Sequence, residues 1–225
     1  MSSYTHPVVL IEGLDGVGKS TLVRALATRL GATVISSPPN MPDPSDPSRD
    51  LRLRMDTAEK GPRREYYRAS NFHASLLIEE ARLDQPVILD RYWPSTASFA
   101  MLDGGIPDWE PLGTWPLGLV EPDVMVVLTV NEAKRRQRMD DRGLQVTEEE
   151  EMLAEGSAER AKVLAALLHF EPIEIDTSNL TPQDVLDEVM FWLTRCEIIE
   201  VDNAAKETSQ APVWPGSDFA KREQA

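Results

Sequence analysis

Several kinds of reactive residue are scarce in this sequence. Cys196 is the single cysteine in 225 residues, so an internal disulfide is excluded and the chain fits a reducing compartment. The three histidines have no metal-ligand spacing among them, and no G-x-S-x-G or Cys/His arrangement is present. These absences argue against a disulfide-rich scaffold, a histidine metal centre and covalent catalysis.

Long hydrophobic runs are missing too. No apolar run reaches the length of a transmembrane helix, and residues 1–6 are short and polar rather than charged and then apolar. We therefore expect no membrane contact and a cytoplasmic location. The hydrophobic content of 41% still suffices for one full core, so we expect one domain over residues 1–202 and a polar, poorly ordered tail over residues 203–225.

Positive charge is the third scarcity. Lys and Arg number 23 against 38 Asp and Glu, which gives a net charge of -15 and argues against binding to nucleic acid or an anionic membrane. The arginines nevertheless gather in three places, at residues 49–54, 63–68 and 135–142. An acidic protein that binds a phosphorylated ligand must concentrate its cations locally, so these clusters are candidate parts of a site.

What the sequence does contain is an alternation of strand and helix patterns. Apolar runs at residues 8–11, 86–89 and 124–130 are typical of buried parallel strands, and residues 33–35 and 173–175 are shorter candidates. Helical patterns lie between them, which predicts an α/β fold with a mostly parallel sheet flanked by helices. Ligands of such sheets bind beyond the carboxyl ends of the strands.

The segment I-E-G-L-D-G-V-G-K-S, residues 11–20, fits the phosphate-loop pattern G-x-x-x-x-G-K-[ST]. An expected strand precedes it and a helical pattern follows; without that context it would be a glycine-rich turn that fits by chance. Glycines let consecutive N–H groups turn toward an anion, Lys19 would bind the β and γ phosphates, and the Ser20 hydroxyl would bind Mg²⁺. We therefore expect a P-loop NTPase fold that binds a nucleoside triphosphate. The residues assigned to ATP are Gly13, Asp15, Gly16, Gly18, Lys19, Ser20 and Thr21.

A second motif, Asp90-Arg91-Tyr92, follows the strand expected at residues 86–89. An Asp at a strand end beside a phosphate loop can hold the water shell of Mg²⁺, and the adjacent Arg can clamp a phosphate with two hydrogen bonds. By itself the tripeptide is also consistent with a surface ion pair. The phosphate loop makes phosphate binding the stronger interpretation.

Together the two motifs resemble the thymidylate kinase family, which carries a G-x-D-G-x-G-K-[ST] loop and a later D-R-Y. The resemblance runs from about residue 8 to residue 193 and is strongest to the mitochondrial UMP/CMP kinase branch. It implies a P-loop fold with a mobile lid, and an ATP-dependent nucleoside monophosphate kinase. The stretches that carry the likeness are S-P-P at 37–39, D-R-Y-W-P-S-T-A at 90–97, Pro122-Asp123 before a strand, and L-T-V at 128–130 followed by an Arg-rich helix to Arg142-Gly143.

The resemblance also implies roles for single residues. Lys19 and Ser20 match the family's ATP-phosphate and Mg²⁺ residues. Asp15 matches the carboxylate that contacts the acceptor sugar, Arg91 the residue that grips the acceptor phosphate, and Asp90 its metal-organising neighbour.

The lid should supply the cation that stabilises the transition state, because this phosphate loop has no Arg at its variable positions. Arg135, Arg138 and Arg142 fall in the lid region, and Arg138 or Arg142 is the candidate. An exposed helix charge is the alternative for each arginine, above all for Arg136.

Base recognition departs from the family pattern. Thymidylate kinases stack the base on an aromatic residue and read thymine O4 with an Arg a few residues later. Here Tyr66 or Tyr67 can stack, but residues 69–72 contain no Arg. Asn71 can donate to a uracil or thymine carbonyl or accept from a cytosine amine, unless it merely caps or faces solvent. The acceptor-binding residues assigned are Asp15, Arg52, Tyr66, Tyr67, Asn71, Arg91 and Tyr92.

These assignments predict Mg²⁺-dependent transfer of the ATP γ-phosphoryl group to the 5′-phosphate of dTMP, dUMP, UMP or CMP. The alternatives are a deoxynucleoside kinase that uses Glu12 as general base, and a catalytically silent nucleotide-binding sensor. By resemblance alone, we also expect a homodimer that pairs through helices flanking the sheet.

Overall fold

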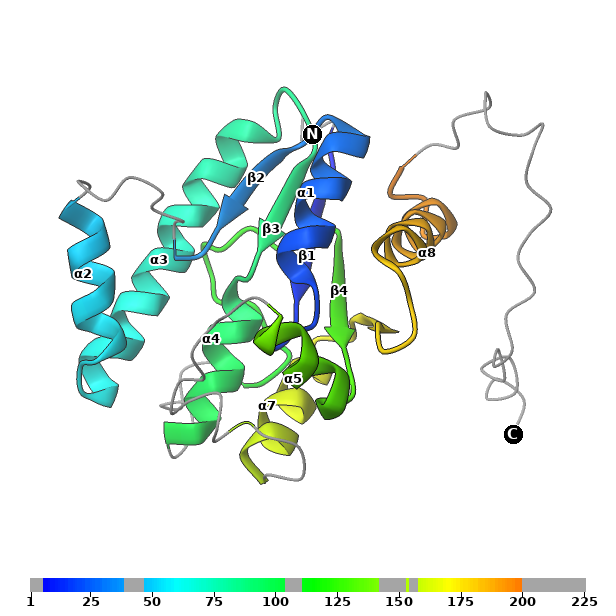
Figure 1. Cartoon of the computed structure of the whole chain (residues 1–225). Coiled ribbons are helices and arrows are strands. Elements are labelled where there is room, and N and C mark those ends of the chain that lie inside the picture. The colour runs from blue at the N-terminus through cyan, green and yellow to red at the C-terminus, as the bar shows by residue number, and fades with distance from the viewer. Residues whose placement is uncertain (1–5, 39–46, 104–110, 142–152, 154–157, 200–225) are drawn as a thin grey trace, which may run out of the picture.

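The computed structural model describes residues 6–38, 47–103, 111–141, 153 and 158–199. Its centre is a five-stranded parallel sheet in the order β2-β3-β1-β4-β5 (Figure 1). This arrangement confirms the predicted α/β fold, and each strand lies where the sequence places it. The strands are β1 (Val8–Glu12), β2 (Thr33–Ser36), β3 (Val87–Asp90), β4 (Val124–Thr129) and β5 (Ile173–Asp176).

Helices cover the sheet. They are α1 (Lys19–Leu30), α2 (Pro47–Asp56), α3 (Lys60–Ala81), α4 (Trp93–Ala100), α5 (Glu132–Asp140), α7 (Ala158–Leu168), α8 (Pro182–Arg195) and the short 3₁₀ helix η1 (Met101–Asp103). In Figure 1, α1 lies in front of β1 and β3, and α3 passes behind β2. α1 packs against α8, and α4 packs against both α3 and α7.

Local signals fix the ends of two of these helices. α1 ends at Gly31, whose left-handed backbone (φ 61°) lets its N–H donate to the Ala27 carbonyl oxygen. α8 begins with a capping box: the Asp184 N–H donates to Thr181 Oγ1 at 3.2 Å, and the Thr181 N–H donates to Asp184 Oδ2 at 2.9 Å.

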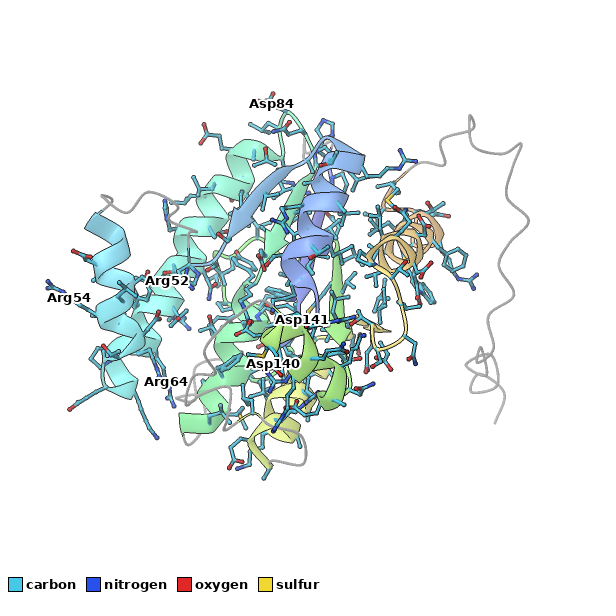
Figure 2. The ribbon with its side chains drawn as sticks, in the orientation of Figure 1. Arg52, Arg54, Arg64, Asp84, Asp140 and Asp141 are labelled. Carbon is cyan, nitrogen blue, oxygen red and sulfur yellow. The ribbon has the colours of Figure 1, made fainter. Side chains whose placement is uncertain are left out.

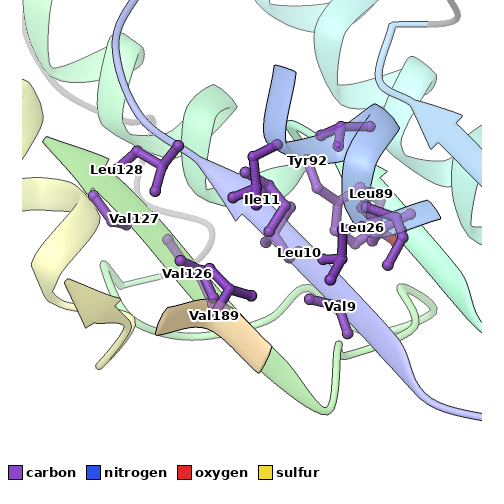
Figure 3. Packing of buried hydrophobic residues seen from close by; sticks show 14 of the residues in the cluster. Val9, Leu10, Ile11, Leu26, Leu89, Tyr92, Val126, Val127, Leu128 and Val189 are labelled. Carbon is purple, nitrogen blue, oxygen red and sulfur yellow. The ribbon is translucent and has the colours of Figure 1, made fainter. Parts of the chain in front are cut away.

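The core is densest around β1. Every residue of this strand is buried, because β1 lies in the middle of the sheet with helices on both sides. Figure 3 shows Leu10 of β1 in the same cluster as Leu26 of α1, Val126 of β4 and Val189 of α8. The register pairs Ile11 with both Asp90 of β3 and Val126, so β1 and β3 end at nearly the same level and β4 extends beyond them.

The carboxyl ends of all strands therefore meet at one edge of the sheet, near α4 and α5 in Figure 1. The connections from β1 to α1 and from β3 to α4 both start at this edge. It is the edge where a parallel sheet binds its ligands.

Some predictions fall beyond the described part of the chain. The polar tail at residues 203–225 and the lid residue Arg142 lie outside the described residues, so the domain division at residue 202 stays a prediction. None of the helices described above is both long and apolar enough to span a bilayer.

Candidate active site

The phosphate loop, residues 13–18, leaves β1 and leads directly into α1. Gly13 and Gly18 have φ angles of 137° and 108°, a region in which residues with side chains are strained. A Cβ atom at Gly13 would also overlap the carbonyl oxygen of Leu128 in β4, so the loop can pack on the sheet only with glycine there. The N-terminus of α1 adds a partial positive charge to the loop.

Lys19 begins α1, and its side chain is buried beneath the loop. The Nζ atom donates to the Leu14 carbonyl oxygen at 2.9 Å and to Asp15 Oδ1 at 3.4 Å. Burial and the charge of Arg91 lower the pKa of Lys19 to about 8, although three nearby carboxylates act in the opposite direction. The charge of Lys19 therefore changes in a pH range close to neutral.

Arg91 is presented by a strained turn at the end of β3. Its φ angle is 65°, in the left-handed region that residues other than glycine rarely adopt. The guanidinium Nη2 donates to Asp15 Oδ1 at 2.6 Å, and Nη1 donates to Ser95 Oγ at 3.2 Å. Burial would lower the pKa of Arg91, but the carboxylates of Asp15, Glu12 and Asp90 raise it, so the group stays charged.

Asp15 is the carboxylate that contacts both cations. Its side chain is 60% exposed, so it lies at the mouth of the loop. Burial would raise the pKa of Asp15, but the charges and hydrogen bonds of Arg91 and Lys19 lower it to about 2. The structure thus brings Lys19 of the phosphate-loop motif and Arg91 of the D-R-Y motif to the Asp15 carboxylate. The roles of these residues in phosphate binding stay predictions.

The two residues assigned to Mg²⁺ lie at the same edge. Ser20 is exposed in the first turn of α1, and Asp90 is half-buried at the last position of β3. The Asp90 carboxylate raises the pKa of both Lys19 and Arg91, which places its charge at the site. A hydroxyl and a carboxylate fit Mg²⁺, which prefers oxygen ligands and completes its shell with water and substrate phosphates. Across the described ranges no three Asp, Glu, His or Cys side chains form a metal-binding group, so phosphate oxygens would have to complete this pair.

Arg138 of α5 lies against the phosphate loop. Its Nη1 donates to the Val17 carbonyl oxygen at 3.1 Å and to Thr177 Oγ1 at 2.9 Å, and its Nη2 donates to the Thr177 carbonyl oxygen at 2.8 Å. Thr177 follows β5, so this guanidinium joins the loop to the end of the outer strand. Of the two lid cations expected to be catalytic, Arg138 lies beside the ATP loop, and Arg142 is not among the described residues.

Arg135 has a different partner. Glu132 is buried, and its carboxylate accepts from Arg135 at 2.7 Å, Arg136 at 2.8 Å and Arg160 at 2.7 Å. The hydrogen bonds from Arg135 outweigh burial and, with those from the other arginines, lower the pKa of Glu132 to about 2. The side chain of Arg136 is 64% exposed and that of Arg135 is 5% exposed, so of these two arginines Arg136 is the exposed helix charge.

Asn71 of α3 is buried, with 1% of its surface exposed, so the alternative that it faces solvent is wrong. Its Oδ1 accepts from Ser37 Oγ at 2.6 Å, and its Nδ2 donates to Thr96 Oγ1 at 2.9 Å. Ser37 follows β2 and Thr96 lies in α4, so three elements meet at this amide. Sequence reasoning did not assign Ser37 or Thr96 to the site, although both lie in stretches that carry the family likeness.

Arg52, Tyr66 and Tyr67 lie where α2 meets α3. Figure 2 shows Arg52 on the side of α2 that faces α3, and Arg54 on the outer side. The rings of Tyr66 and Tyr67 meet edge to face at 5.5 Å, and the Tyr67 hydroxyl donates to Asp56 at 2.6 Å. Arg52 Nε lies 3.8 Å from the same Asp56 carboxylate. Asp56 of α2 therefore contacts both Arg52 and Tyr67, one of the two residues expected to stack on the base.

Tyr92 packs in the core behind the site, where sequence reasoning expected a contact with the acceptor. It is 1% exposed, and its ring lies 6.0 Å from that of Trp115. Burial raises the pKa of its hydroxyl to about 12. The D-R-Y pattern does not reveal that the Tyr92 side chain is buried while the Arg91 side chain reaches Asp15.

A parallel sheet, a glycine loop that leads to a buried lysine, and an arginine-bearing turn beside that loop are the features of a P-loop NTPase fold. The family model for thymidylate kinase matches residues 11–189, and the chain belongs to the thymidylate kinase family. The predicted family is thereby confirmed.

A curated relative and two solved structures are similar to the chain to different extents. UMP-CMP kinase 2, mitochondrial, from Homo sapiens is 36% identical over 163 residues, which cover 69% of this chain and 35% of that protein. The chain thus spans about a third of the length of this curated relative. Among solved structures, thymidylate kinase from Candida albicans has a TM-score of 0.62 at 19% identity, covering 86% of this chain and 93% of that one. Deoxyadenosine kinase from M. mycoides has a TM-score of 0.55 at 17% identity, covering 84% and 99%. At these identities the two structures show a shared fold alone.

Proposed function

We propose that this protein transfers the γ-phosphoryl group of ATP to the 5′-phosphate of a pyrimidine nucleoside monophosphate. The products would be ADP and the nucleoside diphosphate, and the acceptor would be dTMP, dUMP, UMP or CMP. The observation that carries the proposal is the shared carboxylate: Asp15 Oδ1 lies 2.6 Å from Arg91 and 3.4 Å from Lys19. Two cations this close can hold two phosphate groups end to end.

In the proposed mechanism, Lys19 and the loop N–H groups bind the ATP phosphates, and Arg91 exchanges Asp15 for the acceptor phosphate. Because the acceptor phosphate is already an anion, no general base is needed. Catalysis then consists of alignment and neutralisation of charge. Mg²⁺, held through Ser20 and Asp90, would neutralise charge between the β and γ phosphates.

The transition-state cation of the proposal is Arg138, with Arg142 as its alternative. Arg138 already donates to the Val17 carbonyl oxygen of the loop, which supports its assignment to the ATP side. An arginine at that place stabilises the charge that develops on the transferred phosphoryl group.

The pyrimidine preference is assigned to Asn71, which would have to exchange its hydrogen bonds to Ser37 and Thr96 for bonds to the base. Its amide oxygen can accept from a cytosine amine, and its NH₂ group can donate to a uracil or thymine carbonyl. The name of the human relative, UMP-CMP kinase 2, supports the same pair of bases. Tyr66 or Tyr67 would stack on the ring.

Assembly and location are further parts of the proposal. We propose a homodimer that pairs through helices flanking the sheet, with residues 1–202 as the kinase domain. A cytoplasmic location stays a prediction, because the human relative is mitochondrial by name.

An assay of acceptors tests the proposal. The protein is incubated with ATP and Mg²⁺ and with dTMP, dUMP, UMP, CMP, AMP or thymidine, and the products are separated by chromatography. We expect a diphosphate from at least one pyrimidine monophosphate and no product from thymidine. Phosphorylation of thymidine alone would favour a deoxynucleoside kinase, and ATP binding without transfer would favour a silent sensor; either result contradicts the proposal.

A further inference from the structure

Glu12, the last residue of β1, is a carboxylate with no exposed surface. Its Oε1 accepts from the backbone N–H of Tyr92 at 2.9 Å and from that of Ser95 at 3.2 Å. Its Oε2 accepts from the Ser95 hydroxyl at 2.6 Å. Both carboxylate oxygens are therefore bound by the residues that begin α4.

A charge at this position is unfavourable in itself. Burial is the largest influence on the pKa of Glu12 and raises it above its usual range, although Arg91, Ser95 and Tyr92 offset part of this effect. An apolar residue at a buried strand end would avoid the desolvation of a carboxylate. A carboxylate at this place indicates a role beyond packing.

The turn that Glu12 holds is the turn that carries Arg91. The Arg91 N–H donates to the Ile11 carbonyl oxygen at 3.2 Å, directly before Glu12. The N-cap residue of α4, Tyr92, makes no side-chain capping bond. Glu12 of the neighbouring strand β1 caps this helix instead. Ser95 completes the link, because its hydroxyl donates to Glu12 and accepts from Arg91 Nη1 at 3.2 Å.

We propose that Glu12 is a positioning residue that sets the distance between the phosphate loop and the Arg91 guanidinium, with Ser95 as the link. This inference rests on the proposed function. Glu12 precedes Gly13, so one residue ends β1, begins the loop and fixes the Arg91 turn. Phosphoryl transfer depends on alignment, and a displacement of about 1 Å can lower turnover by about a hundredfold.

The same contacts exclude Glu12 as the general base of a deoxynucleoside kinase. Both of its oxygens already accept from N–H or O–H donors, and the side chain has no exposed surface. A base must lie within hydrogen-bond reach of the substrate hydroxyl. Glu12 acts through Arg91 and does not touch the substrate.

Three variants test the role: Glu12→Gln, Glu12→Ala and Ser95→Ala. Ser98→Ala is the matched control, since Ser98 is also buried in α4 but its hydroxyl has no hydrogen-bond partner among the described residues. We expect kcat to fall about tenfold in Glu12→Gln and about a hundredfold in Glu12→Ala, with the Kd for ATP changed less than about twofold. Ser95→Ala should also lower kcat, and Ser98→Ala should keep the wild-type value.

The conservative variant separates positioning from folding. In Glu12→Gln the amide oxygen can still accept from both N–H groups while the buried charge is removed, so the melting temperature should be kept or raised. If Glu12→Gln lowers kcat without lowering the melting temperature, Glu12 does more than stabilise the fold. Equal kcat values in Glu12→Gln, Ser95→Ala and Ser98→Ala would overturn the proposal, as would losses of kcat that parallel losses of ATP affinity and melting temperature.

A crystal structure of Glu12→Ala distinguishes failure of this role from failure of the proposed function. We expect Arg91 to leave its positive φ and Nη2 to move away from Asp15. If Arg91 keeps both features, the positioning role is overturned even in an active enzyme. If both are lost while the wild-type protein phosphorylates no monophosphate, the positioning role is supported and the proposed function fails.

Discussion

Arg91 Nη2 and Asp15 Oδ1 lie 2.6 Å apart, and Lys19 Nζ lies 3.4 Å from the same oxygen. A chain with a net charge of -15 thus gathers two cations at one loop. Arg91 comes from the turn after β3 and Lys19 from the start of α1, so the carboxylate joins the two motifs across the edge of the sheet.

Removal of either cation should abolish most of the activity. Lys19→Ala and Arg91→Ala are each expected to lower kcat/KM about a hundredfold or more, on the order of 3 kcal/mol for one transition-state donor. Steady-state kinetics with the best monophosphate measure the effect. Arg54→Ala is the control, since Arg54 is exposed on the outer side of α2 (Figure 2) and should leave kcat/KM unchanged. Near-normal rates in both active-site variants would contradict the assignment.

The charge of Asp15 should control the pH range of ATP binding. Burial and Arg91 lower the pKa of Lys19 to about 8, and Asp15 raises it. Asp15→Asn removes that contribution, so the pKa of Lys19 should fall further and the ammonium should be lost at lower pH. The alkaline limb of the pH profile of kcat/KM for ATP, measured between about pH 6 and about pH 10, should shift to lower pH in the variant.

The matched control for this shift is Asp84→Asn, because Figure 2 shows Asp84 far from the phosphate-loop edge of the sheet. That variant should keep the wild-type limb. A limb that stays in place or moves to higher pH in Asp15→Asn would disprove the coupling between Asp15 and Lys19.

Asn71 should set the balance between bases. Asn71→Asp replaces a donor and acceptor pair by acceptors only, so it should favour cytosine, which offers an amine, over uracil, which offers a carbonyl. We expect the ratio of kcat/KM for CMP to that for UMP to rise about tenfold, the value of one hydrogen bond of about 1.4 kcal/mol. Ser70→Ala is the control, since the Ser70 hydroxyl donates to the Tyr66 carbonyl oxygen within α3. An unchanged ratio in Asn71→Asp would remove Asn71 from base recognition.

The Glu132 cluster should contribute to stability. Glu132→Gln removes the charge that Arg135 and Arg160 share inside the protein, and we expect a loss of about 3 kcal/mol in the free energy of unfolding, measured with urea. Arg136 contacts the same carboxylate from an exposed position, so Arg136→Ala should cost less than about 1 kcal/mol. Equal losses of unfolding free energy in Glu132→Gln and Arg136→Ala would show that the buried ion pairs of Glu132 stabilise the protein no more than the exposed one.

The same cluster predicts how stability depends on pH. The pKa of Glu132 is lowered from 4.5 to about 2, so its contribution is fully present above pH 4.5 and is lost as the pH falls through about 2. The difference in stability between wild type and Glu132→Gln should therefore shrink as the pH falls from 4.5 toward 2. A difference that stays constant over this interval would place the stabilising charge elsewhere.

The sequence predicts those features that depend on neighbours in the chain. The apolar run of β1, the glycines after it and Gly31 at the end of α1 act locally, and each lies where the pattern indicates. Glu12 and Ser95 are 83 positions apart, and only the pairing of β1 with β3 brings them together. Because hydrophobic periodicity carries no information on such partners, neither the burial of Glu12 nor that of Tyr92 could be predicted.

Asp15 has a consequence for the anions that surround the protein in solution. Before substrate binds, this carboxylate is an internal counterion for both the guanidinium of Arg91 and the ammonium of Lys19. Sulfate or chloride would have to displace the Asp15 carboxylate, and either ion would offer the two cations little more negative charge than Asp15 already does. A row of aligned phosphates would offer more, so we expect the loop to discriminate against simple salts.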